Sequence, residues 1–200
     1  MAQPGGVFEL TEPIKINVRR TQLTEEQFME LCQENPELRL EMTAQKELVI
    51  RPPVGSEGGW RSGETFLALG NWTKMDGSGI AFDSSTGFTL PNGAIRSPDA
   101  SWMKRERWEA LSKRDRATFA PICPDFVIEV RSETDRLSDL LEKMDEYLAN
   151  GARLGWVIDP FEKREYLYRP DQSVEILEDP AELRGDPVLL GFVFPIRELW

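Results

Sequence analysis

Histidine is absent from the 200-residue chain. This excludes Ser-His-Asp and Cys-His nucleophilic machinery, HNH-type nucleases and any zinc site built on imidazole. If the chain is an enzyme, its chemistry must come from carboxylates, lysine, arginine, tyrosine or serine.

Cysteine is scarce, and long apolar runs are missing. Cys32 and Cys123 lie in unrelated segments and form neither a disulfide framework nor a CxxC metal site. No run approaches the roughly 18 apolar residues of a membrane span, and no secretory signal pattern opens the sequence. We therefore expect a soluble, cytoplasmic protein that does not bind membranes.

Positive charge is also in short supply, since 24 Lys and Arg residues face 35 Asp and Glu residues and the net charge is −11. Tight, sequence-independent binding of nucleic acid depends mainly on neutralising phosphates, so this balance counts against it. A local basic strip together with a bound cation can offset the repulsion. One basic stretch, 102–116, surrounds Trp102 and Trp108. We interpret it as a solvated helix face with a tryptophan anchor, and a nucleic-acid contact surface is the alternative.

The apolar patterns predict an α/β chain with one domain over residues 21–200. Residues 1–20 are expected to be either a poorly ordered arm or a short edge segment. Helices are predicted from a capping box at Thr24 to before Pro36, and over 57–74 and 134–150. Strands are predicted over 38–42, 47–51, 79–82, 86–90, 94–96, 126–130, 154–158, 165–168 and 174–177. The apolar segment 188–200 is expected to dock on the body of the domain.

Two of these strands and the helix between them form a βαβ pattern. The strands 126–130 and 154–158 flank the amphipathic helix 134–150, whose end is marked by Gly151. Such a unit predicts that the two strands are parallel.

Glu129 is the firmest candidate for a functional residue. It is a charge inside the otherwise apolar strand 126–130, where an unpaired carboxylate is costly unless it binds a cation or a metal. Strand alternation places it on one face with Asp125, Val127 and Arg131. Asp125 stands at the strand entrance beside a proline and is interpreted as a turn residue.

Asp99 and Lys143 are also candidates for functional residues, and each has an alternative structural interpretation. Asp99 lies 30 positions before Glu129 in a Ser-Pro-Asp sequence, which alone is a common turn. At about 100° per residue, Lys143 lies at the edge of the buried face of helix 134–150. From there its ammonium can reach the end of the preceding strand. An ordinary boundary lysine that extends into water is an equally good interpretation.

Arg131 occupies the place of the lysine in a Glu-x-Lys motif. Arginine can hold a phosphate but cannot act as a base. The alternative is a structural ion pair with Asp125, Asp99 or Glu133.

Several motifs agree in order and spacing with a known family. These are Ser97-Pro98-Asp99-Ala100-Ser101-Trp102, the segment from Cys123 to Ser132, Glu142-Lys143-Met144-Asp145-Glu146-Tyr147 and the segment from Gly151 to Pro160. Over roughly residues 22–196 the chain resembles the Uma-type putative restriction endonuclease family of the PD-(D/E)XK nuclease superfamily. The resemblance implies a restriction-endonuclease-like α/β core with a mixed central sheet flanked by helices.

The resemblance also implies a site and a reaction. It assigns Asp99 and Glu129 as acidic ligands of Mg²⁺ or Mn²⁺, with a backbone carbonyl as a third ligand and Glu41 as a further candidate ligand. Lys143 takes the role of the motif lysine that Arg131 has displaced, and Glu64 is an additional acidic candidate for catalysis. The implied function is hydrolysis of phosphodiester bonds in DNA.

Two other function classes are alternatives to the nuclease. A catalytically inactive interaction or assembly module of the same fold is favoured by the acidic charge and by the missing Glu-x-Lys lysine. A small-molecule phosphohydrolase or nucleotide-binding protein is disfavoured, because the chain has no glycine-rich phosphate loop of the P-loop or dinucleotide type. If DNA is the substrate, a homodimer is expected, since one acidic protomer is small for gripping a duplex.

Overall fold

A mixed six-stranded sheet forms the centre of the structure, a computed structural model that describes residues 12–21 and 23–200. Residues 1–11 of the expected arm lie outside the described residues. The strands follow the order β11-β10-β9-β8-β7-β4. Their bounds are Gly79–Asp83 (β4), Ala100–Lys104 (β7), Phe126–Val130 (β8), Leu154–Asp159 (β9), Arg164–Tyr168 (β10) and Glu175–Glu178 (β11). Only β8 and β9 are parallel to each other, and the remaining neighbours are antiparallel.

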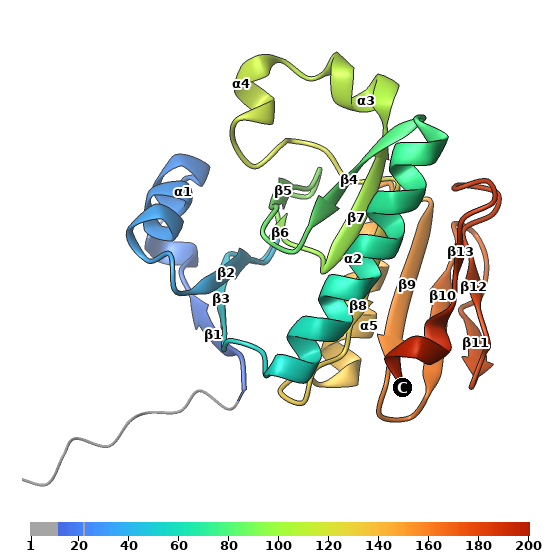
Figure 1. Ribbon diagram of the computed structural model, residues 1–200. Coiled ribbons are helices and arrows are strands. Elements are labelled where there is room, and N and C mark those ends of the chain that lie inside the picture. The colour runs from blue at the N-terminus through green and yellow to red at the C-terminus, as the bar shows by residue number, and fades with distance from the viewer. Residues whose placement is uncertain (1–11, 22) are drawn as a thin grey trace, which may run out of the picture.

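The predicted βαβ unit is confirmed. Helix α5 (Leu137–Ala149) connects the parallel strands β8 and β9 and packs on one face of the sheet (Figure 1). Its buried Leu140, Met144 and Tyr147 recur at helical spacing and join a core cluster with Val127 of β8. The helix begins three residues later than predicted. Asp135 instead accepts hydrogen bonds from the backbone N–H and the hydroxyl of Ser132, in the turn that precedes the helix.

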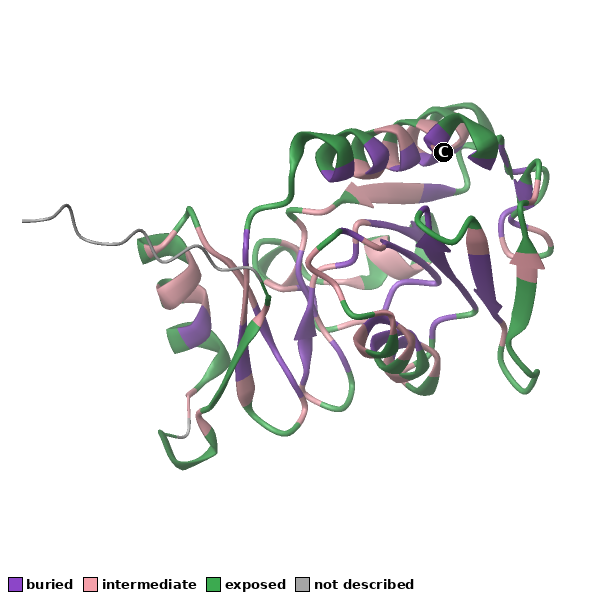
Figure 2. Cartoon of the chain, turned by 90° about the horizontal axis from the view of Figure 1, so that it is seen from below, coloured by how far each residue is buried: buried purple, intermediate pink, exposed green. Residues whose placement is uncertain are grey.

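The opposite face of the sheet is covered by α2 (Ser56–Asp76) and by the C-terminal segment (Figure 1). Leu69 of α2 packs against the strand residues Phe126 and Trp156 in the second large cluster. Phe192 stacks on Trp156 at 5.7 Å between ring centroids, which confirms that the apolar end docks on the domain. The elements of this end are β12 (Leu183–Arg184), β13 (Val193–Phe194) and the 3-10 helix Ile196–Leu199. With both faces covered, β8 and β9 are buried along their whole length (Figure 2).

A smaller antiparallel sheet stands beside the central one. Its strand order is β1-β3-β2-β6-β5, and helix α1 (Glu25–Glu34) covers it, with Phe28 in a cluster with Met42 and Ile95. The strand bounds are Ile14–Asn17 (β1), Arg39–Met42 (β2), Glu47–Arg51 (β3), Phe88–Thr89 (β5) and Ile95–Arg96 (β6). Strand β1 is the short edge segment that the sequence allowed. The predicted capping box of α1 is present between Thr24 and Gln27.

The segment 100–104 was not predicted as a strand, and the structure shows it as β7. Its apolar residues do not alternate with polar ones, because both faces are buried: Trp102 belongs to one core cluster and Met103 to the other.

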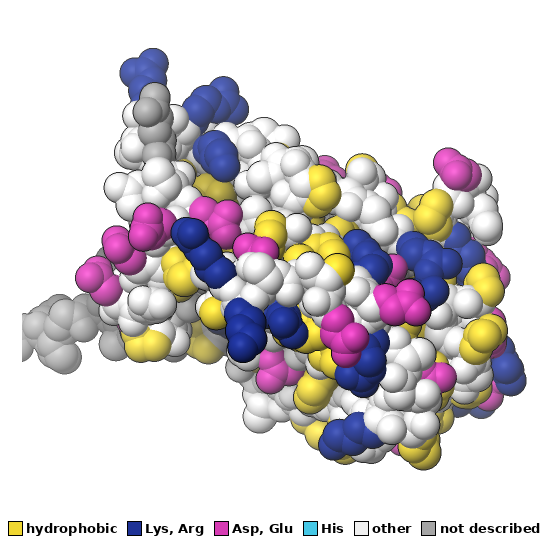
Figure 3. Space-filling view, turned by 90° about the horizontal axis from the view of Figure 1, so that it is seen from above, with side chains coloured by type: hydrophobic (Ala, Val, Ile, Leu, Met, Phe, Trp, Pro, Cys, Tyr) yellow, Lys and Arg dark blue, Asp and Glu magenta, His cyan; other side chains and the backbone are white. Residues whose placement is uncertain are grey.

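The rest of the basic stretch forms the short helices α3 (Arg105–Ala110) and α4 (Lys113–Arg116). Several of its arginines serve the fold. Arg105 donates to the carbonyl of Gly77, and Arg116 lies over the ring of Trp108. On the face that Figure 3 shows, Lys and Arg side chains are interspersed with Asp and Glu. Among the described residues, no helix is long and apolar enough to cross a membrane.

Candidate active site

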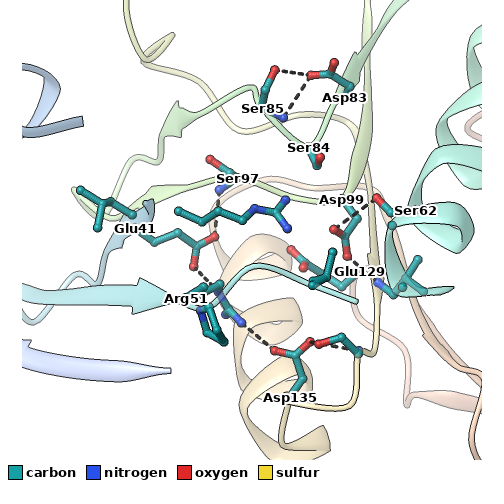
Figure 4. Close-up of a pocket in the computed structure, with 18 of the residues that line it drawn as sticks. Glu41, Arg51, Ser62, Asp83, Ser84, Ser85, Ser97, Asp99, Glu129 and Asp135 are labelled. Carbon is teal, nitrogen blue, oxygen red and sulfur yellow. Dashed lines mark hydrogen bonds and ion pairs between the residues drawn. The ribbon is translucent and has the colours of Figure 1, made fainter. Parts of the chain in front are cut away.

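Asp99 and Glu129 stand opposite each other where β7 and β8 meet the smaller sheet. The antiparallel register pairs Ala100 with Ile128, and one further step brings Asp99 opposite Glu129. Directly opposed residues point to the same face of a sheet, with Cβ atoms about 5 Å apart. Figure 4 shows both carboxylates in a cavity of about 600 Å³. The cavity is lined by residues of both sheets, of the N-terminal half of α2 and of α5.

Asp99 is held through one of its two oxygens. Its Oδ2 accepts a hydrogen bond of 2.8 Å from the backbone N–H of Val130. Among the described residues, its Oδ1 has only a long contact of 3.5 Å from the hydroxyl of Ser62. Burial raises the pKa of Asp99 above its usual value, although the Val130 N–H and the charge of Lys143 act in the opposite direction. Asp99 is therefore fixed in place with one oxygen largely free.

Glu129 uses its two oxygens just as unequally. Its Oε1 accepts a hydrogen bond of 3.2 Å from the hydroxyl of Tyr147 and lies 2.7 Å from Nζ of Lys143. No described residue donates a hydrogen bond to its Oε2. Burial raises the pKa of Glu129 to about 7; Lys143 opposes this rise, and the charges of Asp99 and Glu41 add to it. A carboxylate in such surroundings gains from a nearby cation.

Lys143 is part of this site. It is only 4% exposed, so the interpretation as a boundary lysine that extends into water is wrong. Its Nζ lies 2.7 Å from Oε1 of Glu129, 2.7 Å from Oε1 of Glu41 and 3.4 Å from the carbonyl oxygen of Ser97. Helix α5 carries Lys143 beside Met144 and Tyr147, whose burial fixes the face that it presents.

Glu41 of β2 is surrounded by cations. Besides Lys143, its carboxylate lies 3.3 Å from Nη1 of Arg96 and 3.5 Å from Nε of Arg51, and it accepts from the Ser97 N–H at 3.0 Å. Burial alone would raise the pKa of Glu41. The charges of Lys143, Arg51 and Arg96 outweigh burial and hold that pKa well below its usual range.

The two arginines and their outer partners were not predicted from the sequence. Arg51 also pairs with Asp135 at 2.8 Å, and Arg96 with Glu146 at 2.6 Å. Each arginine is the last residue of a short predicted strand, and this position does not indicate which carboxylates it contacts. Together with Lys143 they place three cations around Glu41.

Three other candidate residues lie outside the cavity or serve the fold. Arg131 pairs with Asp159 at 2.9 Å and lies over the ring of Phe161, which corrects the predicted pairing with Asp125, Asp99 or Glu133. It follows the last residue of β8, so strand alternation no longer sets its direction. Asp125 is buried, accepts from the Lys104 N–H at 2.9 Å and pairs with Arg107 at 2.9 Å.

Glu64 does not line the cavity. The α2 residues that do so are Gly58, Gly59, Ser62, Gly63 and Phe66. Two positions after Ser62, Glu64 is turned by about 200° around the helix axis. Ser62 is the α2 side chain that reaches Asp99.

The carboxylates of the cavity are candidate ligands for a metal ion. Among residues 12–21 and 23–200, no three acidic or cysteine side chains are grouped closely enough to hold a metal ion by themselves. Mg²⁺, however, usually keeps several waters and takes only one or two carboxylates from the protein. The register neighbours Asp99 and Glu129 each offer an oxygen with little or no protein contact. This donor set suits a hard divalent cation such as Mg²⁺ or Mn²⁺.

Comparisons with known proteins agree with this architecture. The family model Uma2, described as "Putative restriction endonuclease", matches residues 25–197. The crystal structure of a putative nuclease belonging to DUF820 from Anabaena variabilis ATCC 29413 superimposes with a TM-score of 0.71 at 23% sequence identity. The match covers 88% of this chain and 96% of that chain, and it confirms the restriction-endonuclease-like fold. No curated protein matches the chain in sequence.

Proposed function

The chain belongs to the Uma2 family of putative restriction endonucleases, and on that premise we propose that it is a metal-dependent endonuclease that hydrolyses phosphodiester bonds of DNA. One observation carries the proposal. Asp99 and Glu129 face each other in a cavity, and the ammonium of Lys143 lies 2.7 Å from Glu129. Two acids and a lysine in this arrangement suit phosphodiester hydrolysis without histidine.

The metal would be held by the free oxygens of Asp99 and Glu129. When bound, Mg²⁺ or Mn²⁺ supplies charge that polarises a phosphate and makes a neighbouring water more acidic. The protein keeps both carboxylates in position: Val130 holds Asp99, and Tyr147 and Lys143 hold Glu129.

In a Glu-x-Lys motif, the lysine of the motif supplies a positive charge. Here Lys143 of α5 supplies that charge instead. The ammonium is fixed at the cavity wall, where it can neutralise negative charge that develops on the attacked phosphate. Because it is nearly buried, this interaction is weakly screened by water and salt.

DNA is the proposed partner, and we propose that the chain acts as a homodimer in the cytoplasm. Arg39 lines the cavity and provides positive charge close to Asp99. The net charge of −11 leaves one protomer with little basic surface for a whole duplex.

A catalytically inactive interaction or assembly module of the same fold is the second candidate. The position of Arg131 favours it. Arg131 stands where the motif lysine is expected, and its guanidinium is engaged by Asp159 outside the cavity. An inactive protein would retain the fold and lack metal-dependent cleavage.

The deciding experiment is cleavage of plasmid and oligonucleotide DNA with Mg²⁺ or Mn²⁺. Wild type should cut only with the metal, and both Glu129→Gln and Lys143→Met should reduce the rate by about 100-fold or more. Asp145→Asn is the matched control, because Asp145 is exposed on the same helix as Lys143. Absence of cleavage of any nucleic acid, or cleavage that survives both substitutions, would contradict the proposed activity.

A further inference from the structure

The two carboxylates that bind Lys143 differ in how fully their oxygens are used. Oε1 of Glu41 binds Lys143 and the Ser97 N–H, and Oε2 accepts from Arg96 and pairs with Arg51. A carboxylate offers about four lone-pair sites. Glu41 uses three of them for Lys143, the Ser97 N–H and Arg96, and Nε of Arg51 lies 3.5 Å from Oε2, so neither oxygen is without a protein partner. Glu129, in contrast, has an Oε2 to which no described residue donates.

We propose that Glu41 is a positioning residue, which anchors Lys143 and stays outside the metal's coordination shell. This inference rests on the proposed nuclease function and departs from the prediction that Glu41 is a further metal ligand. To reach a metal, Glu41 would have to give up at least one of its contacts with three cations in a largely buried site, which is costly even though each cation keeps a second carboxylate.

The hydrogen-bonding capacity of Lys143 supports the same role. An ammonium has three N–H donors, and Nζ of Lys143 has three acceptors, from Glu41, Glu129 and the carbonyl of Ser97. Glu41 reaches it from the smaller sheet and Glu129 from the central sheet, so the two carboxylates hold the ammonium between the sheets.

This anchor matters most when a cation is present at Asp99 and Glu129. A cation there repels the Lys143 ammonium. Glu41 then provides the carboxylate that retains Lys143 in the cavity wall. Without Glu41 the ammonium can move, and a misplacement of about 1 Å can cost about 100-fold in rate.

Metal affinity separates a positioning residue from a ligand. Mn²⁺ binding is measured by calorimetry for wild type, Glu41→Gln and Glu129→Gln. We expect the affinity of Glu41→Gln to stay within about twofold of wild type, and that of Glu129→Gln to fall by about tenfold or more. The kcat of Glu41→Gln for DNA should fall by about 100-fold with little change in KM. Loss of Mn²⁺ affinity in Glu41→Gln equal to that in Glu129→Gln would overturn the inference.

Glu146→Gln is the matched control. Glu146 pairs with the same Arg96 and does not contact Lys143. It should therefore keep both the Mn²⁺ affinity and the kcat of wild type. If Glu41→Gln does not fold, Glu41→Asp, which keeps the charge on a shorter side chain, provides the same comparison with a smaller loss of kcat.

A stability cycle tests the anchor without metal or activity. Denaturant unfolding is measured for Glu41→Gln, Lys143→Met and the double variant. If Glu41 holds Lys143, the double variant loses less stability than the two single variants together, and strict additivity would overturn the inference. Wild type that neither binds Mn²⁺ nor cleaves would instead overturn the proposed function, while the cycle still decides the Glu41–Lys143 contact.

Discussion

The ammonium of Lys143 lies 2.7 Å from Oε1 of Glu129, although the two residues belong to a helix and to a strand. The βαβ connection explains this proximity. Strand β8 carries Glu129 on the face that α5 covers, and α5 turns its Lys143 side chain toward the end of that strand. The connection that builds the core therefore also brings an acid and its cation together.

If the opposed carboxylates of Asp99 and Glu129 bind a divalent metal, the metal should stabilise the folded protein. Mn²⁺ at 100 times its dissociation constant should stabilise wild type by about 2.7 kcal/mol, measured as a rise in melting temperature over EDTA-treated protein. Asp99→Asn should lose most of this gain, because one ligand oxygen becomes a neutral amide. An equal rise in Asp99→Asn and wild type would show that the metal binds elsewhere.

The close packing of β9 on α5 at Gly155 should affect both the stability of the fold and the candidate active site. A Cβ at this position would overlap Sδ of Met144, the neighbour of Lys143 on α5. Gly155→Ala should therefore displace α5, reduce the free energy of unfolding by about 1–3 kcal/mol and lower cleavage activity. The measurements are denaturant unfolding and the cleavage rate.

Gly70→Ala is the control for this substitution. A Cβ at Gly70 in α2 would meet only ordinary contact distances, so alanine there should stabilise the helix by about 1 kcal/mol. Equal effects of the two substitutions would show that the space between β9 and α5 is not limiting.

Local sequence patterns predicted the elements that carry Glu129 and Lys143. The βαβ unit was predicted from the apolar strand, the amphipathic helix and the glycine that follows the helix. Helical geometry then placed Lys143 at the edge of the buried face of that helix. These features depend on periodicity within one segment, which a single sequence displays.

The partners of Glu41 could not be predicted in the same way. Glu41 meets Arg96 and Lys143 across the contact between two sheets, and no local pattern records such a contact. Strand β7 was missed for a related reason, because burial on both faces removes the alternation of polar and apolar residues.

Removal of the hydroxyl of Tyr147 should have a small effect on the stability and on the cleavage rate. It donates a hydrogen bond of 3.2 Å to Oε1 of Glu129, while the ring is fully buried in the core. Tyr147→Phe keeps the ring and should lower the free energy of unfolding by about 1 kcal/mol, measured by denaturant unfolding. The cleavage rate should fall less than in Lys143→Met. A loss as large as that of Lys143→Met would contradict this ranking.

The buried carboxyl group of Glu165 in β10 should make the stability of the protein depend on pH, independently of the candidate active site. Its side chain is fully buried, and no described residue donates to either carboxylate oxygen. Burial raises the pKa of Glu165 to about 9, and the charge of Asp159 adds to this rise. In the unfolded chain the pKa has its ordinary value of 4.5. The folded state therefore binds more protons between these values, and its stability falls as the pH rises from 4.5 to 9.

Replacing Glu165 by leucine should remove this dependence. Glu165→Leu places an apolar side chain among the core residues and should be more stable than wild type by several kcal/mol at pH 9, with a smaller difference at pH 5. Denaturant unfolding at both values measures the change. Glu162→Gln is the control, because Glu162 is exposed in the turn before the same strand. If the difference between Glu165→Leu and wild type is the same at both pH values, the carboxyl group does not titrate within this range in the folded state.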